Sequence, residues 1–257
     1  RGGEVKLKPG MRVTPLDLAI PLIGLDEIGA FLRRNRVLEQ AQVEQAPYVL
    51  ASNKQSLLSA PGDVVVARGA LNEGAQSTQD SMYGVYRLGE RFKDPVTGEA
   101  LGIEARLIGS AQKLDSSTDN TELTEFEVKT VKEEIRQGDR LLPLRERILD
   151  AAYQPRAPEF ELTNGFMIAV EGGVSQIGSL NTVILNKGAR DGLEVGHMLH
   201  IYQTGVRVRD ELAGDMVRLP DVRSGLLMVF EVFDKSSLAV VLKASRPLAV
   251  MDKVKTP

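Results

Sequence analysis

The chain has 257 residues, of which 42% are apolar and 26% charged, as in ordinary folded domains, and its length allows one or two of them. Its net charge of −3 excludes a general attraction to nucleic acid or anionic lipid, and the absence of cysteine excludes disulfides and thiolate chemistry. Tryptophan is absent and only 5% of residues are aromatic, which disfavours the stacked rings of sugar clefts and single-strand nucleic-acid platforms.

The first part of the chain predicts a lead-in and then a helix. Residues 1–15 are expected to be an N-terminal lead-in or linker. Negative charge at the start and apolar residues at helical spacing predict a helix at 26–38. The opposite face of this helix carries Arg33, Arg34 and Arg36. These arginines form either a solvated face or a partner-binding surface.

Beyond this helix the pattern is that of short strands separated by Gly, Pro, Asn and Asp. We predict a first β domain at 16–152, a proline-containing linker at 153–158 and a second β domain at 159–257. Asp94–Gly98 predicts a hairpin connection, and the polar stretches 71–80 and 115–121 predict loops. The expected strands are Tyr48–Leu50, Val64–Val66, Tyr83–Leu88, Ile103–Ile108, Phe126–Val131, Phe166–Val170, Thr182–Leu185, Met198–Tyr202, Leu226–Phe233 and Leu238–Leu242.

The two halves share a pattern, which indicates a duplication. We align Tyr48–Leu50 with Thr182–Leu185 and Val64–Val66 with Met198–Ile201, and we match the closing Asp139 with Asp252. The predicted fold is therefore mainly β: two related small β-barrel or sandwich (SH3-like) domains, with one short helix in the first half.

The sequence carries none of the motifs that we looked for as signs of metal binding, catalysis or cofactor binding. His197 and His200 lie three apart in a segment patterned as a strand, where such residues point to opposite faces and cannot share a metal ion. There is no nucleophile elbow, dinucleotide fingerprint or P-loop. We therefore predict no catalytic, cofactor-binding or metal-binding residues and no enzymatic activity.

One strand predicts a contact surface. The run Gly225–Phe233 is apolar on successive residues, as though both of its faces were covered. One face is expected to meet its own core, and the other the first domain, a second subunit or a partner.

The stretch from Phe166 to His197 carries a family resemblance. Its strands Phe166–Val170 and Thr182–Leu185, with the loop N-K-G-A-R-D-G-L-E-V-G that follows, resemble the C-terminal region of the TsaP family, accessory proteins of the type IV pilus secretin. The loop pattern is also similar to the C-terminal domain of the flagellar assembly protein FlgT. The resemblance extends over most of residues 12–257.

The resemblance implies a periplasmic structural protein that forms a ring around a PilQ-type outer-membrane secretin and ties the pore to the cell wall in twitching motility. A peptidoglycan-binding LysM domain is expected upstream, so glycan binding is not assigned to these residues. The alternative is a nucleic-acid-binding tandem of β barrels, which requires a basic stripe with aromatic residues and is disfavoured by the net charge of −3.

Overall fold

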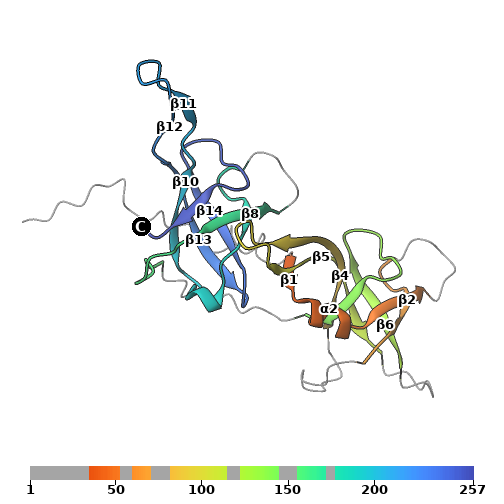
Figure 1. Cartoon of the computed structure of the whole chain (residues 1–257). Helices are drawn as coiled ribbons and strands as arrows, with labels where there is room; N and C mark the ends of the chain where they lie inside the picture. Colours follow the sequence, from red (N-terminus) through yellow and green to blue (C-terminus); the bar gives the residue numbers. More distant parts are fainter. Residues whose placement is uncertain (1–34, 53–59, 71–81, 115–121, 145–154, 172–176) are drawn as a thin grey trace, which may run out of the picture.

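The computed structural model of the chain describes residues 35–52, 60–70, 82–114, 122–144, 155–171 and 177–257 (Figure 1). The predicted lead-in and the loops at 71–80 and 115–121 lie outside these ranges. The described part is mainly β, with one α-helix, which confirms the predicted fold class. Its elements are β1 (Asn35–Leu38), α2 (Gln40–Gln45), β2 (Tyr48–Ser52), β3 (Val64–Arg68), β4 (Met82–Lys93), β5 (Ala100–Lys113), β6 (Leu123–Val131), β7 (Arg140–Pro143), β8 (Gly165–Val170), β9 (Thr182–Leu185), the 3₁₀ turn η2 (Ala189–Asp191), β10 (Met198–Gln203), β11 (Arg207–Arg209), β12 (Met216–Arg218), β13 (Val222–Val232), β14 (Ser237–Ala244) and β15 (Lys253–Lys255).

The first half forms a closed circuit of antiparallel strands. Going round it, each strand pairs with the next in the order β2-β3-β6-β5-β4-β7, and β7 returns to β2. The short β1 lies outside the circuit, on the first part of β5. Inside, Phe126 is fully buried and its ring meets Tyr83 edge-on, with the ring centroids 5.1 Å apart. Alternate residues along the strands thus build a core of their own.

The second half is a closed barrel with strand order β8-β9-β14-β13-β10-β15. Its interior is filled by aliphatic side chains, among which Met167, Leu185, Leu199 and Leu227 are fully buried. Long β13 and β14 carry register shifts, which let a sheet bend enough to close. The barrel therefore also has its own core.

The two circuits have the same topology. If the six strands of each circuit are numbered along the chain, both follow the neighbour order 1-2-5-4-3-6. The equivalent strands are then β2 and β8, β3 and β9, and β4 and β10. The predicted alignment, which matched β2 with β9 and β3 with β10, is wrong by one strand. β9 lies between β8 and β14 as β3 lies between β2 and β6, so β9 is the equivalent of β3 and not of β2.

A recurring turn explains why the wrong strands looked alike. Asp63, Asp139, Asn181, His197 and Asp252 each accept a hydrogen bond from the backbone N–H three residues earlier and precede a strand. In each turn the residue just before the acceptor has a positive φ. A short polar side chain and a left-handed residue therefore recur wherever this turn occurs, not only at equivalent positions. The predicted match of Asp139 with Asp252 is confirmed, since β7 and β15 are equivalent.

The predicted helix at 26–38 differs from the structure where the two can be compared. Residues 35–38 form β1, paired with Ile103–Arg106, and the α-helix is α2, a few residues later. Val37 and Leu38 are buried against β5, so tertiary pairing decides the conformation of this segment. The N–H of Glu39 then donates to the side-chain oxygen of Gln42 at 3.0 Å, one of the two hydrogen bonds of a capping box, where α2 starts.

The two circuits pack against each other through the hairpin of β4 and β5 (Figure 1). Phe92 and Leu101 of this hairpin join a buried cluster with Met228 and Phe230 on the outer face of β13. Leu227 and Val229 point into the barrel instead. The apolar run at 225–233 therefore has both faces covered, as predicted, and of the occupants we considered for its outer face the first domain is found there.

Polar contacts flank this apolar cluster. The turn Asp94–Gly98 forms as predicted, with Asp94 accepting from the N–H groups of Val96 and Thr97 and Gly98 at φ +74°. The other carboxylate oxygen of Asp94 accepts a hydrogen bond of 2.8 Å from buried Asn186, at the start of the resemblance loop. The tip of the first half is thus tied to the second barrel.

Candidate functional site

The arginines predicted to bind a partner are only partly covered by the structure. Arg33 and Arg34 lie outside the described residues. Arg36 lies on β1, where its guanidinium donates to the carbonyl oxygen of Pro143 and sits 5.2 Å from the ring centroid of Tyr86. Arg36 therefore ties β1 to the first circuit, and its role toward a partner stays a prediction.

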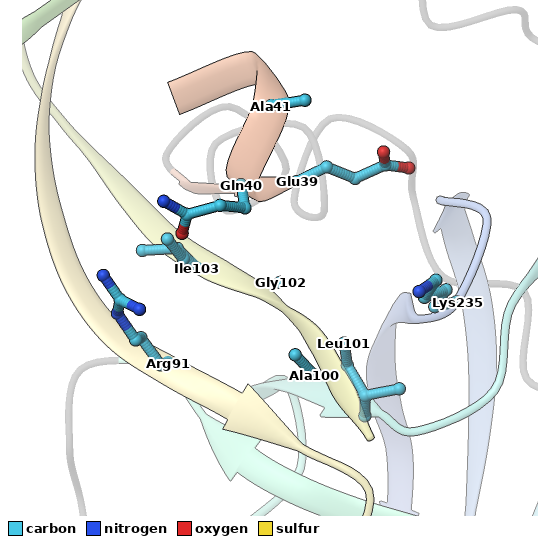
Figure 2. Close-up of a pocket in the computed structure, with 9 residues that line it drawn as sticks. All are labelled: Glu39, Gln40, Ala41, Arg91, Ala100, Leu101, Gly102, Ile103 and Lys235. Atoms are coloured by element: carbon cyan, nitrogen blue, oxygen red, sulfur yellow. The ribbon is translucent and has the colours of Figure 1, made fainter. Parts of the chain in front are cut away.

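A cavity of about 250 Å³ lies beside the contact between the two barrels (Figure 2). Figure 2 shows Arg91 and Lys235 on opposite sides of this space, with α2 closing a third side. Lys235 is already paired with Glu99 at 2.9 Å. The lining residues are Glu39, Gln40, Ala41, Arg91, Ala100, Leu101, Gly102, Ile103 and Lys235. The ionisable lining residues of the cavity are Glu39, Arg91 and Lys235.

The two histidines have structural contacts. The Nδ1 atom of His197 accepts from the N–H of Glu194 at 3.1 Å, and burial lowers the pKa of this imidazole. The ring of His200 packs edge-on against Tyr202. In the part of the chain that the structure describes, no group of three or more His, Cys, Asp or Glu side chains could hold a metal ion. The same residues include no helix long and apolar enough to cross a membrane.

A two-stranded ribbon, residues 205–221, projects from the second barrel (Figure 1). Among the strands that the structure describes, β11 and β12 pair only with each other. Among the described residues, six of the eleven exposed large apolar side chains lie in this ribbon, and Leu212 at its tip is 100% exposed. A two-stranded ribbon has no core of its own beneath it, so these apolar side chains stay exposed to solvent in the described structure.

The strand register gives the ribbon two different faces. Arg207 lies opposite Arg218, Val208 opposite Val217 and Arg209 opposite Met216. Residues directly opposite each other share a face, and neighbours along a strand alternate between faces. The arginine face consists of Arg207, Arg209, Met216 and Arg218; the valine face consists of Val206, Val208, Val217 and Leu219.

The tip of the ribbon is well specified. One carboxylate oxygen of Asp210 accepts from the N–H groups of Leu212 and Ala213, at 2.9 and 3.1 Å. These hydrogen bonds lower the pKa of Asp210. Gly214 takes φ +79°, a left-handed conformation that costs glycine little, and its N–H returns to the carbonyl of Asp210. The connection is therefore a defined hairpin turn.

The base of the ribbon is anchored to the barrel. The carboxylate of Asp221 accepts from the N–H of Gly205 and pairs with Lys253 at 2.8 Å and with Lys255. A Cβ at Gly205 would lie only 1.8 Å from the carbonyl oxygen of Leu219, so the two chains cross here without room for a side chain. The ribbon is thus held in one direction relative to the barrel.

We did not predict this ribbon from the sequence. Its signal is present: Val and Arg alternate over 206–209, a Gly-Asp pair follows at 214–215, and alternation of apolar and basic residues resumes over 217–219. The strands are only three residues each and carry charges where a core strand would be apolar, so the pattern does not resemble the longer runs around it.

Comparison with known proteins adds no relative. No protein-family model matches the chain, and no curated protein shows a significant match to it.

Proposed function

We propose that this chain is a non-enzymatic assembly protein that binds a protein partner through the ribbon. The supporting observation is the valine face, whose four aliphatic side chains are between 39% and 65% exposed on a ribbon fixed at both ends. Burying such side chains at an interface core is the main source of affinity between proteins. A ribbon that is already ordered loses little conformational entropy when it binds.

For the partner, we propose the outer-membrane secretin of a type IV pilus, with the protein in the periplasm. This part rests on the resemblance of residues 166–197 to the TsaP family, and the absence of cysteine fits an oxidising compartment. Copies arranged in a ring on a symmetric secretin would add many weak contacts into stable attachment. Attachment to peptidoglycan would come from an upstream LysM domain.

Co-purification with the secretin tests the proposal. We expect the chain to co-elute with the secretin, and the double variant Val208→Asp/Val217→Asp to lose co-elution because two charges would enter the contact. Val96→Asp is the matched control, since Val96 is 57% exposed on a turn far from the ribbon in sequence. Equal co-elution of all three proteins would exclude the ribbon, and no co-elution of the unmodified chain would exclude the secretin.

The alternative function is binding of nucleic acid, and one observation favours it. A two-stranded ribbon fits the major groove of DNA, and three arginines share the arginine face. Asp210, Glu211 and Asp215 at the tip would face the phosphates of the same groove, which disfavours it. Retention on duplex DNA that falls steeply with salt concentration would support this alternative; we expect no retention.

A further inference from the structure

The outer edge of β11 is an unpaired strand edge. β11 and β12 form a separate two-stranded sheet, and no described strand pairs with the far side of either. A sheet of two strands is marginal in water, and a third strand stabilises it. The ribbon therefore has a place for one more strand.

The hydrogen-bond pattern identifies which backbone groups are free. Leu219 N–H donates to the Val206 carbonyl at 3.0 Å, and Asp210 N–H donates to the Asp215 carbonyl at 2.8 Å. Val206, Val208 and Asp210 therefore direct their backbone N–H and C=O groups inward, to the opposite strand, because hydrogen-bonded and non-hydrogen-bonded pairs alternate in an antiparallel ladder. Arg207 and Arg209 consequently turn their N–H and C=O groups outward.

The side chains at this edge define what could pair there. A strand added to β11 places every second side chain on the arginine face, beside Arg207 and Arg209, and the others on the valine face, beside Val206 and Val208. Arg207 also lies directly opposite Arg218, and like charges in this position destabilise a sheet. Carboxylates on the added strand would offset that repulsion.

We infer that β11 accepts an extended segment of the partner protein as a third strand, in which acidic residues alternate with aliphatic ones. This inference rests on the proposed function only in taking the ribbon as the protein-binding arm. Backbone hydrogen bonds to Arg207 and Arg209 hold the segment, carboxylates meet the arginine face, and aliphatic side chains extend the valine face.

Other occupants fit this edge less well. A second copy paired edge to edge through β11 would bring arginines against arginines, an arrangement that proteins use to prevent self-pairing. A lipid surface that took up Leu212 would also have to take up Asp210, Glu211 and Asp215 around it. The charge of the edge itself thus favours an acidic strand.

A peptide of alternating glutamate and valine, flanked by glycine and serine, is the probe. We expect it to bind the full chain, measured by fluorescence anisotropy, and to bind Arg207→Glu/Arg209→Glu about tenfold more weakly. A peptide of alternating lysine and valine should show the opposite preference. A peptide of the same glutamates and valines in two blocks tests the alternation, and Arg246→Glu, at an exposed arginine in another loop, is the control.

Hydrogen exchange distinguishes strand addition from a merely electrostatic contact. On binding the glutamate–valine peptide, the amides of Arg207 and Arg209 should become protected, whereas those of Met216 and Arg218 on the other edge should not. Peptide binding without this protection, or equal binding of the block peptide, would overturn the inference.

Two further results would also overturn it. In the first, the glutamate–valine peptide does not bind, although Val208→Asp/Val217→Asp abolishes co-elution with the secretin. The proposed function would then stand without strand addition. In the second, the peptide again does not bind, but the chain dimerises or is retained on anionic vesicles or duplex DNA. Arg207→Glu/Arg209→Glu would abolish that dimerisation or retention. Peptide binding with the charge preference, but without secretin co-elution, would instead exclude only the secretin.

Discussion

At the scale of single residues, Asn186 makes three side-chain hydrogen bonds, one of them to the first half. It is fully buried, donates to Asp94 and to the carbonyl of Asn164, and accepts from the N–H of Phe166 at 2.7 Å. We expect Asn186→Ala to lower the free energy of unfolding by about 3 kcal/mol, because several buried polar groups lose their partner. Urea denaturation measures the change, with exposed Gln203→Ala as the control; a loss no larger than that of the control would contradict this role.

The backbone at Met251 allows a stabilising change. Met251 has φ +77° and its side chain is 48% exposed, whereas the equivalent position in the first half is Gly138 at φ +91°. A left-handed conformation costs a non-glycine residue about 1–2 kcal/mol, which glycine would avoid. Glycine also makes the unfolded chain more flexible, and this offsets part of the gain in the free energy of unfolding. Met251→Gly should therefore raise the free energy of unfolding by about 0.5–1 kcal/mol, measured by urea denaturation. Gly138→Ala should lower it, and the same sign for both variants would contradict the argument.

At the scale of elements, the turn between β4 and β5 carries a pH-dependent contact. Hydrogen bonds from Arg190 and Lys235 hold the pKa of Glu99 at about 2, below its ordinary value of 4.5. Since Glu99 ionises at lower pH in the folded protein, its contribution to stability is complete above about pH 4.5 and is lost as the pH falls through about 2. Replacing the carboxylate by Glu99→Gln should lower the melting temperature at pH 7, and this difference should shrink toward pH 2.

A direct titration of the Glu99 carboxyl checks the same contact at low pH, where the whole protein is less stable. The side-chain carboxyl carbon of Glu99, followed by NMR, should titrate well below those of ordinary exposed glutamates. Arg190→Ala should move this midpoint back toward 4.5. A midpoint near 4.5 in the unmodified protein would mean that the ion pairs are not formed in solution.

The elements also show how far local pattern predicts this fold. Strands such as β9, β10 and β14 follow from runs of apolar residues between turn residues, and the turn at Asp94–Gly98 follows from its Pro and Gly. Local pattern does not show which strands of the two halves are equivalent, because the recurring turn also precedes strands that are not equivalent, such as β3 and β10. The helix boundary was missed since Val37 and Leu38 are held by pairing with β5, a contact distant in sequence. The ribbon was missed because its strands lack a buried face.

The candidate surface was predictable only in kind. Absence of catalytic patterns suggested a binding protein, but the arginines chosen from the sequence were those of a helical face at 33–36. Their role toward a partner stays a prediction, and on the ribbon the structure shows further arginines, separated from valines onto two faces by the register of β11 and β12. That separation depends on which residues lie opposite each other across a turn, and a single sequence does not determine this register where neither face is buried.

At the scale of the whole molecule, we expect the contact between the barrels to determine how the protein unfolds. Each half has its own core, yet Leu101, 3% exposed, belongs to the cluster shared with Met228 and Phe230. We expect one cooperative transition by calorimetry, and two separate transitions in Leu101→Asp, because a charge buried there disfavours contact while leaving both cores intact. Val96→Asp, on the exposed turn of the same hairpin, should keep one transition. Two transitions in the unmodified protein would show that the barrels fold independently and that the ribbon is not held at a fixed position relative to the first half.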